Sequence, residues 1–362
     1  MKKIIAIIIS IVFSVIFFSC ARGSSGAAEL VAIESMFKDV VTQAEKWVYP
    51  SDQVGVEADA TAELAAGTYK VGVCIYTFED TFMTFYYNEI ADYFKSLETD
   101  DVKFEVTIAD GKNDMAVQLS QVDDFIADGV DVLIVNLVLA AGGKDVTEKA
   151  RDADIPLVYI NREPASTDMQ ALDYEGRVCY VGADARQSGT IQGQIVVDLP
   201  DSGDIDGDGV VRYITLVGDA ENVDAQYRTI FSIKALDDAG IISMRLFEQR
   251  GDWVRANGKE LTSTALSQFG DAIDVIFANN DDMALGAIEA CKEAGKVIGT
   301  DVYIVGVDAT TLALDALAAG DLTGTVLNDH VNQSHTAIDV AILAISGYDL
   351  KDYYMVDYLA VV

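Results

Sequence analysis

Short apolar runs alternate with amphipathic stretches along most of the chain. The runs are rich in β-branched residues and are bounded by polar turns, which is typical of buried strands, and the stretches between them have apolar residues at helical spacing. The runs fall at residues 69–76, 102–110, 130–138, 156–164, 177–184, 210–218, 242–249, 272–280 and 301–308. Continuous apolar strands separated by helices predict an α/β protein with parallel sheets covered on both faces.

The pattern restarts after an acidic loop near residue 204, so we expect two doubly wound, Rossmann-like lobes joined by a hinge. The first lobe is predicted to contain residues 69–161 and about 328–347. The second is predicted to contain residues 162–327 and about 348–362. A chain of 362 residues is long enough for two cores of this size.

The formal net charge of −34 argues against a nucleic-acid partner, because phosphates need a basic face. It indicates a well-hydrated surface and does not restrict a neutral ligand. The overall charge therefore excludes one class of partner and does not identify the ligand.

The first 20 residues are predicted to be a signal peptide. Lys2 and Lys3 precede an apolar run at 4–18, which is shorter than the roughly 20 residues of a membrane-spanning helix. The run ends in FFSC, which resembles the lipobox of bacterial lipoproteins, so Cys20 is a predicted acylation site that would anchor the chain to a membrane. The alternative is an ordinary signal peptide with an incidental cysteine.

The other cysteines, Cys74, Cys179 and Cys291, have no metal or redox spacing, and their odd number gives no disulfide framework. We expect free thiols.

Residues 21–68 are predicted to hold a flexible tether and a helical segment. Apolar residues recur at helical spacing over 27–47. Either this helix packs on a lobe, or the segment is a spacer from the membrane.

Polar side chains follow the predicted strands where each strand ends, and two aromatic residues lie near them. These residues are Asp80, Phe82, Asn136, Asn222, Asp224, Arg228, Trp253, Asn280, Asp308 and Asn328. Ligands of open α/β sheets bind beyond the carboxyl ends of strands, although Asp and Asn are also common as helix caps and turn residues. Short amides and carboxylates suit a ligand rich in hydroxyl groups, and aromatic faces suit the C–H faces of a pyranose.

Several segments, in this order, resemble the periplasmic galactose/glucose-binding protein family of ABC sugar transporters. They include GVCIYTFEDTFM, YINREP, VDAQYRT, FANNDDMALGAIEA and GDLTGTVLNDHVNQS, within residues 69–347. The resemblance implies a type I periplasmic binding protein fold that closes on one hexose. Phe82 and Trp253 would stack on the sugar, and the polar residues above would bond its oxygens. Asn222 stands where the family usually has His.

An acidic loop has the ligand spacing of an EF-hand in its first half. Asp204, Asp206 and Asp208 stand at positions one, three and five, but position nine is a cation, Arg212. The resemblance implies further calcium ligands from the carbonyl of Val210 and from Asp274. Two interpretations stay open: the loop binds calcium, or Arg212 enters it as a salt bridge in place of the ion.

The ends of the chain depart from the resembled family. The chain stops about where a closing helix would follow, so we expect a rearranged topology in which the helix at 27–47 replaces it.

The resemblance implies a monomeric, lipid-anchored protein in the bacterial periplasm that captures D-glucose, D-galactose or both and delivers it to an ABC permease. Two other classes stay open. One is an enzyme acting on glycosides through carboxylates of the cleft, although no nucleophile motif or phosphate-binding glycine loop is present. The other is a ligand for a chemoreceptor.

Overall fold

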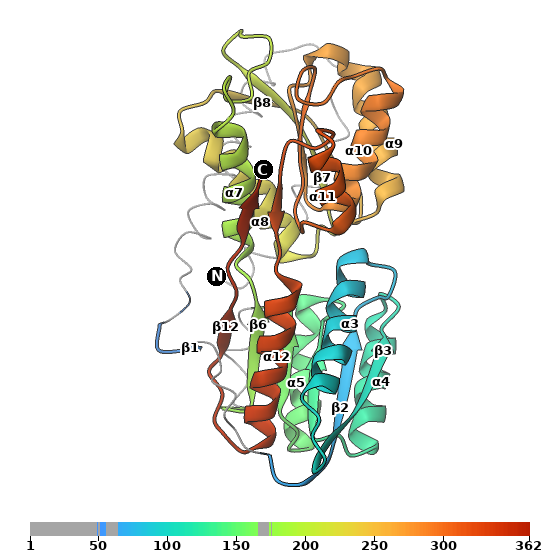
Figure 1. The fold of residues 1–362 in the computed structure, drawn as a ribbon. Coiled ribbons are helices and arrows are strands. Elements are labelled where there is room, and N and C mark those ends of the chain that lie inside the picture. Colours follow the sequence, from blue (N-terminus) through green and yellow to red (C-terminus); the bar gives the residue numbers. More distant parts are fainter. Residues whose placement is uncertain (1–48, 50, 56–63, 166–173, 175) are drawn as a thin grey trace, which may run out of the picture. The chain divides into compact units, whose positions relative to one another are not determined.

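The fold is described from a computed structural model, which defines residues 49, 51–55, 64–165, 174 and 176–362. The predicted signal peptide, the predicted acylation site Cys20 and the predicted helix at 27–47 lie outside the described residues. Within the described part the chain forms two α/β lobes, and both main sheets are parallel (Figure 1). The predicted fold of two Rossmann-like lobes is therefore confirmed.

The first lobe is built on a sheet whose paired strands all run parallel. The strand order is β1 (Val54–Gly55), β12 (Tyr353–Met355), β6 (Val178–Gly182), β5 (Leu157–Ile160), β4 (Val132–Val135), β2 (Gly67–Ile75) and β3 (Val102–Asp110). Its helices are α3 (Thr81–Ser96), α4 (Met115–Ala127), η1 (Ala140–Gly142), α5 (Gly143–Asp152) and α12 (His330–Ile345).

Helices cover both faces of this sheet, as continuous apolar strands require. Alternate residues of β2, such as Val71 and Val73, join the core under α3 and α12. Gly72, between them, faces α4, where a Cβ atom would lie 2.7 Å from the ring of Phe125. The absence of a side chain at this position lets α4 approach the strand closely.

The second lobe has a parallel sheet and a small antiparallel one. The parallel order is β10 (Tyr303–Val305), β9 (Val275–Ala278), β7 (Val211–Val217) and β8 (Ser243–Arg250), and β11 (Thr325–Leu327) pairs with β13 (Leu359–Val361). Its helices are α7 (Ala185–Val197), α8 (Val223–Asp238), α9 (Arg255–Phe269), η2 (Gly270–Ala272), α10 (Asp281–Glu293) and α11 (Thr311–Ala318).

The chain passes between the lobes at three places: from β6 to α7, from β11 to α12, and from β12 to β13. The predicted lobe boundaries need correction here. β6 pairs with β5, so the first lobe continues beyond residue 161, and β12 pairs with β6, so the chain returns to the first sheet after residue 347 (Figure 1). An apolar run shows that a strand is buried, but it does not show which strand it pairs with. For this reason the lobe boundaries predicted from the sequence were wrong at these segments.

The cysteines of the described part, Cys74, Cys179 and Cys291, are buried free thiols, as expected.

Helix α7 packs tightly on α8, the helix that carries part of the candidate site. A Cβ atom on Gly193 would lie 2.2 Å from the carbonyl oxygen of Ser232. We expect Gly193→Ala to destabilise the protein by about 1–3 kcal/mol, the usual cost of overpacking, measured by urea unfolding. Gly67→Ala is the control, because its nearest atoms lie 4.0 Å away. Equal stability of the two variants would contradict this packing.

Candidate ligand-binding site

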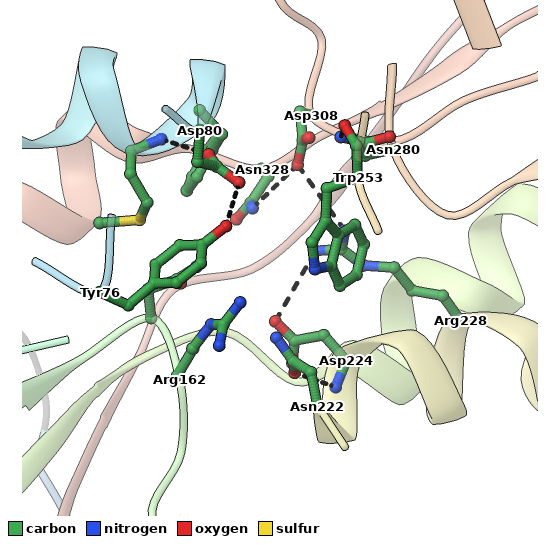
Figure 2. A pocket seen from close by; sticks show the side chains of 13 residues that line it. Tyr76, Asp80, Arg162, Asn222, Asp224, Arg228, Trp253, Asn280, Asp308 and Asn328 are labelled. Atoms are coloured by element: carbon green, nitrogen blue, oxygen red, sulfur yellow. Dashed lines mark hydrogen bonds and ion pairs between the residues drawn. The ribbon is translucent and has the colours of Figure 1, made fainter. Parts of the chain in front are cut away.

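A polar pocket lies where the two lobes meet, and it encloses about 330 Å³ including its open mouth. Its walls come from both lobes (Figure 2). The lining residues are Tyr76, Asp80, Phe82, Met83, Asn161, Arg162, Asn222, Asp224, Arg228, Trp253, Asn280, Asp308 and Asn328.

The parallel topology explains why these side chains converge. The carboxyl ends of neighbouring parallel strands meet at one edge of each sheet, and helices begin there. Asp80, Asn222 and Asn280 are the N-caps of α3, α8 and α10, and each accepts a hydrogen bond from a backbone N–H of the first turn. Asp and Asn at strand ends were also expected as helix caps. These three residues are caps, and they line the pocket as well.

A buried guanidinium organises the second-lobe wall. Arg228 is only 3% exposed. It donates to the carbonyl oxygen of Asn279 at 2.8 Å and to the hydroxyl of Tyr358 at 3.2 Å. Its nitrogens lie 3.8 Å from a carboxylate oxygen of Asp308 and 3.9 Å from one of Asp224. These contacts hold both carboxylates at the pocket.

The protonation of this cluster follows from burial opposed by charge pairing. Burial raises the pKa of Asp224 and of Asp308, and Arg228 opposes both shifts. Burial disfavours the charged form of Arg228, but Tyr358 and the two carboxylates raise its pKa above the usual value. Arg228 therefore stays charged, while its acidic neighbours are easier to protonate than exposed carboxylates.

Two lining residues adopt backbone conformations that L-amino acids rarely occupy. Trp253 has φ of 67° and Asp308 has φ of 121°. Such conformations cost of order 1–3 kcal/mol each and are typically found at functional sites. Here they belong to an aromatic and an acidic residue of the same pocket wall.

The first-lobe wall is organised around Tyr76. Its hydroxyl donates to Asp80 at 2.6 Å, and the guanidinium of Arg162 lies 3.6 Å from the centre of its ring. Arg162 also donates to the carbonyl oxygen of Val138 at 2.9 Å. The tyrosine is thereby held between a carboxylate and a cation, and all three side chains line the pocket (Figure 2).

The lobes also contact each other beside the pocket. A nitrogen of Arg162 lies 3.6 Å from a carboxylate oxygen of Asp219 in the second lobe. The hydroxyl of Thr81, at the start of α3, donates to Asp282 of α10 at 2.5 Å. Both contacts join residues on opposite sides of the cleft.

All the predicted sugar-contacting residues except Asn136 line the pocket. The side chain of Asn136 is fully buried behind it, where it accepts from the backbone N–H of Tyr76 at 3.2 Å and donates to the side-chain oxygen of Asn161 at 3.1 Å. The structure thus gives Asn136 a positioning role, because an amide at a strand end can also bind the neighbouring strand ends.

The pocket has four lining residues that were not predicted from the sequence: Tyr76, Met83, Asn161 and Arg162. A signal for two of them was present. Asn161 and Arg162 directly follow β5, and the rule that selected the other strand-end residues applies to them equally.

Four of the predicted metal residues, Asp204, Asp206, Asp208 and Val210, lie in the loop between α7 and β7, and the fifth, Asp274, directly precedes β9. Carboxylate oxygens of Asp204, Asp206 and Asp208 lie within 4.8 Å of one another. Arg212 donates to Asp208 at 2.6 Å, and its backbone N–H donates to Asp274 at 2.7 Å.

The proteins that resemble this chain belong to one family. A sequence model of the periplasmic binding protein domain matches residues 71–349. A putative rhizopine-binding protein of Rhizobium meliloti is 36% identical over 296 residues, 81% of this chain and 90% of its own. The D-galactose/methyl-galactoside binding periplasmic protein MglB of Haemophilus influenzae is 35% identical over 286 residues, 78% of this chain and 83% of its own.

A solved structure supports the same assignment. An ABC transporter solute binding protein from Bacillus halodurans, with bound myo-inositol, is 29% identical with a TM-score of 0.70. The match covers 82% of this chain and 95% of that one. The alternative of a glycoside-acting enzyme is thereby set aside. The chain belongs to the periplasmic binding protein family, as a solute-binding protein of ABC transport and not an enzyme.

Proposed function

We propose that the protein captures a neutral cyclic polyol of hexose size between its lobes, with D-glucose and D-galactose as the first candidates, and delivers it to an ABC permease. The observation that carries this proposal is the composition of the pocket wall. Carboxylates, amides and guanidinium groups from both lobes converge on a space of about 330 Å³. Such a wall offers both donors and acceptors to a ring of hydroxyl groups.

The charges of the wall disfavour an anionic ligand. Three carboxylates, Asp80, Asp224 and Asp308, are opposed by two cations, Arg162 and Arg228, and burial raises the pKa of Asp224 and of Asp308. An anionic ligand would add a further unpaired negative charge to this buried cluster, which is costly. A neutral polyol instead gains charge-assisted hydrogen bonds without adding a charge.

The aromatic residues would contribute apolar contact to the same ligand. Phe82 and Trp253 line the pocket from different lobes. We propose that they pack against the C–H faces of a pyranose or cyclitol ring. Trp253 carries a buried indole N–H without a partner in the structure, so a ligand oxygen is a suitable acceptor for it.

A second candidate ligand is myo-inositol. It is bound in the 29% identical solute binding protein from Bacillus halodurans, and it offers six ring hydroxyls without a ring oxygen or a hydroxymethyl group. In this chain the side-chain oxygen of Asn222 already accepts from the backbone N–H of Asp224 at 2.8 Å. Asn222 stands where the resembled sugar-binding family has His for the terminal hydroxymethyl, so a ligand without that group would lose little here.

Ligand binding would act by shifting an open–closed equilibrium. The pocket has walls on both lobes, so a ligand that contacts both walls favours the closed arrangement by its additional contacts there. The contacts of Thr81 with Asp282 and of Arg162 with Asp219 would add to the closed state. The permease would then recognise the closed protein.

Membrane attachment through Cys20 is also a proposal. Cys20 follows the apolar run 4–18 and lies outside the described residues. Among the residues that the structure describes, none forms a helix suited to crossing a bilayer. We propose a lipid-anchored monomer at the periplasmic face of a membrane.

Titration calorimetry with D-glucose, D-galactose and myo-inositol tests the ligand. At least one is expected to bind with a dissociation constant on the order of 1 μM or tighter. Asp224→Ala should weaken that ligand by about 2–4 kcal/mol, because it removes a buried charged partner. Asp237→Ala, an exposed position on the same helix, is the control. The proposal fails if none of the three binds, and the pocket assignment fails if Asp224→Ala keeps full affinity.

Thr81→Val tests the closing contact, because Thr81 does not line the pocket. The variant loses the hydrogen bond to Asp282, which destabilises the closed state and leaves the residues that contact the ligand unchanged. Ligand binding should therefore weaken by about 0.5–1.5 kcal/mol. Calorimetry measures the affinity, and small-angle scattering measures the ligand-induced compaction. Thr190→Val, which removes an exposed hydroxyl bond within α7, should change neither. Unchanged affinity in Thr81→Val would argue against this contact as part of closure.

Cys20→Ser should release the expressed protein from the membrane fraction in a bacterial host, because the acylated thiol is lost. Fractionation with immunoblotting and mass spectrometry of the mature N-terminus measure the effect. Cys291→Ser changes a buried thiol and should leave the distribution as in the wild type. Membrane retention of the Cys20 variant would reject the lipid anchor.

A further inference from the structure

The segment of residues 204–212 comprises the end of the loop between α7 and β7 and the first two residues of β7. It begins like a calcium-binding loop but has a different centre. Acids stand at its first, third and fifth positions, and Gly209 at the sixth has φ of 90°. This is the spacing and the backbone turn of an EF-hand loop. The loop contributes no residue to the pocket described above.

The guanidinium of Arg212 contacts the groups that a calcium ion would need. One of its nitrogens donates to Asp208 at 2.6 Å. The other lies 3.8 Å from a carboxylate oxygen of Asp206 and 3.4 Å from the carbonyl oxygen of Val210. A cation cannot be a calcium ligand, and it repels another cation at this range.

The other predicted ligands are engaged within the protein. Both carboxylate oxygens of Asp204 accept backbone N–H groups, from Gly207 at 3.1 Å and from Gly209 at 2.8 Å. Asp274 accepts the backbone N–H of Arg212 at 2.7 Å. Calcium takes six to eight oxygen ligands. With Arg212 in place, the donor set does not fit a metal ion.

The contacts of Arg212 make it a permanent internal cation of the loop. Arginine stays protonated over the whole physiological range. Calcium occupancy, in contrast, depends on the free ion concentration.

We propose that the Arg212 side chain replaces a divalent cation in this loop, so that the second lobe keeps its structure without calcium. The location makes the replacement useful. The loop leads directly into β7, and Arg212 pairs within that strand with Met244 of β8. A side chain that neutralises the loop therefore stabilises the start of an inner strand of the second-lobe sheet, independently of any ion supply.

The replacement should be reversible by one substitution. Arg212→Gln removes the cation and offers a side-chain oxygen of the kind that calcium binds. Arg212→Met, of similar length, removes the cation and offers no oxygen. The full chain and both variants are compared after treatment with a chelator, by thermal unfolding and by calorimetric titration with calcium chloride.

The wild type is expected to show no heat of calcium binding and no change in Tm at millimolar calcium. Both variants should unfold at lower temperature than the wild type in chelator, because like charges are left unneutralised. Calcium should raise the Tm of Arg212→Gln by about 3 °C or more, and it should bind that variant about tenfold or more tightly than Arg212→Met.

Two results would overturn the proposal. One is a calcium-dependent heat or Tm increase in the wild type. This result does not depend on whether either variant folds. The other is an Arg212→Gln variant that folds, by its circular dichroism, yet does not respond to calcium. Both readouts are independent of sugar binding, so failure here leaves the proposed polyol function untouched.

Discussion

The buried contact between Arg228 and its acidic neighbours is the interaction on which the pocket depends. A guanidinium that is 3% exposed cannot remain charged without partners, and the structure supplies Asp224, Asp308 and Tyr358. These partners come from three separate parts of the chain: the start of α8, the loop after β10, and the segment between β12 and β13. One side chain thereby fixes the relative positions of distant segments, and the same carboxylates face the ligand space.

The way the chain passes between the lobes follows from the same constraint. Tyr358 lies on the last passage, between the first-lobe strand β12 and the second-lobe strand β13, and it bonds Arg228. Asn328 lies on another passage and donates to Asp308 at 3.2 Å. Two of the three passages are thus hydrogen-bonded to the cluster that lines the pocket. Bending at the hinge and rearrangement of the ligand-binding residues are therefore mechanically linked.

The sequence predicted the parts of this structure that local patterns determine. Apolar runs without alternation revealed parallel strands, and polar residues at their ends gave most of the pocket wall, since strand polarity alone places those ends together. The pattern could not show that β6 and β12 complete the first sheet, because strand pairing is decided by contacts between distant segments. For the same reason it gave Asn136 a place at the ligand, although its amide bonds two neighbouring strand ends. The sequence could not show whether calcium or the Arg212 side chain neutralises the acidic loop, because that depends on the direction in which the side chain points.

The position of Trp253 has a practical consequence. The chain has two tryptophans, and this one forms part of the pocket wall, with its ring centre 5.7 Å from the guanidinium carbon of Arg228. Indole fluorescence is sensitive to nearby charge and to exclusion of water. Emission from the unlabelled molecule should therefore change as solute enters and leaves, which gives the protein an intrinsic optical sensor of its own occupancy.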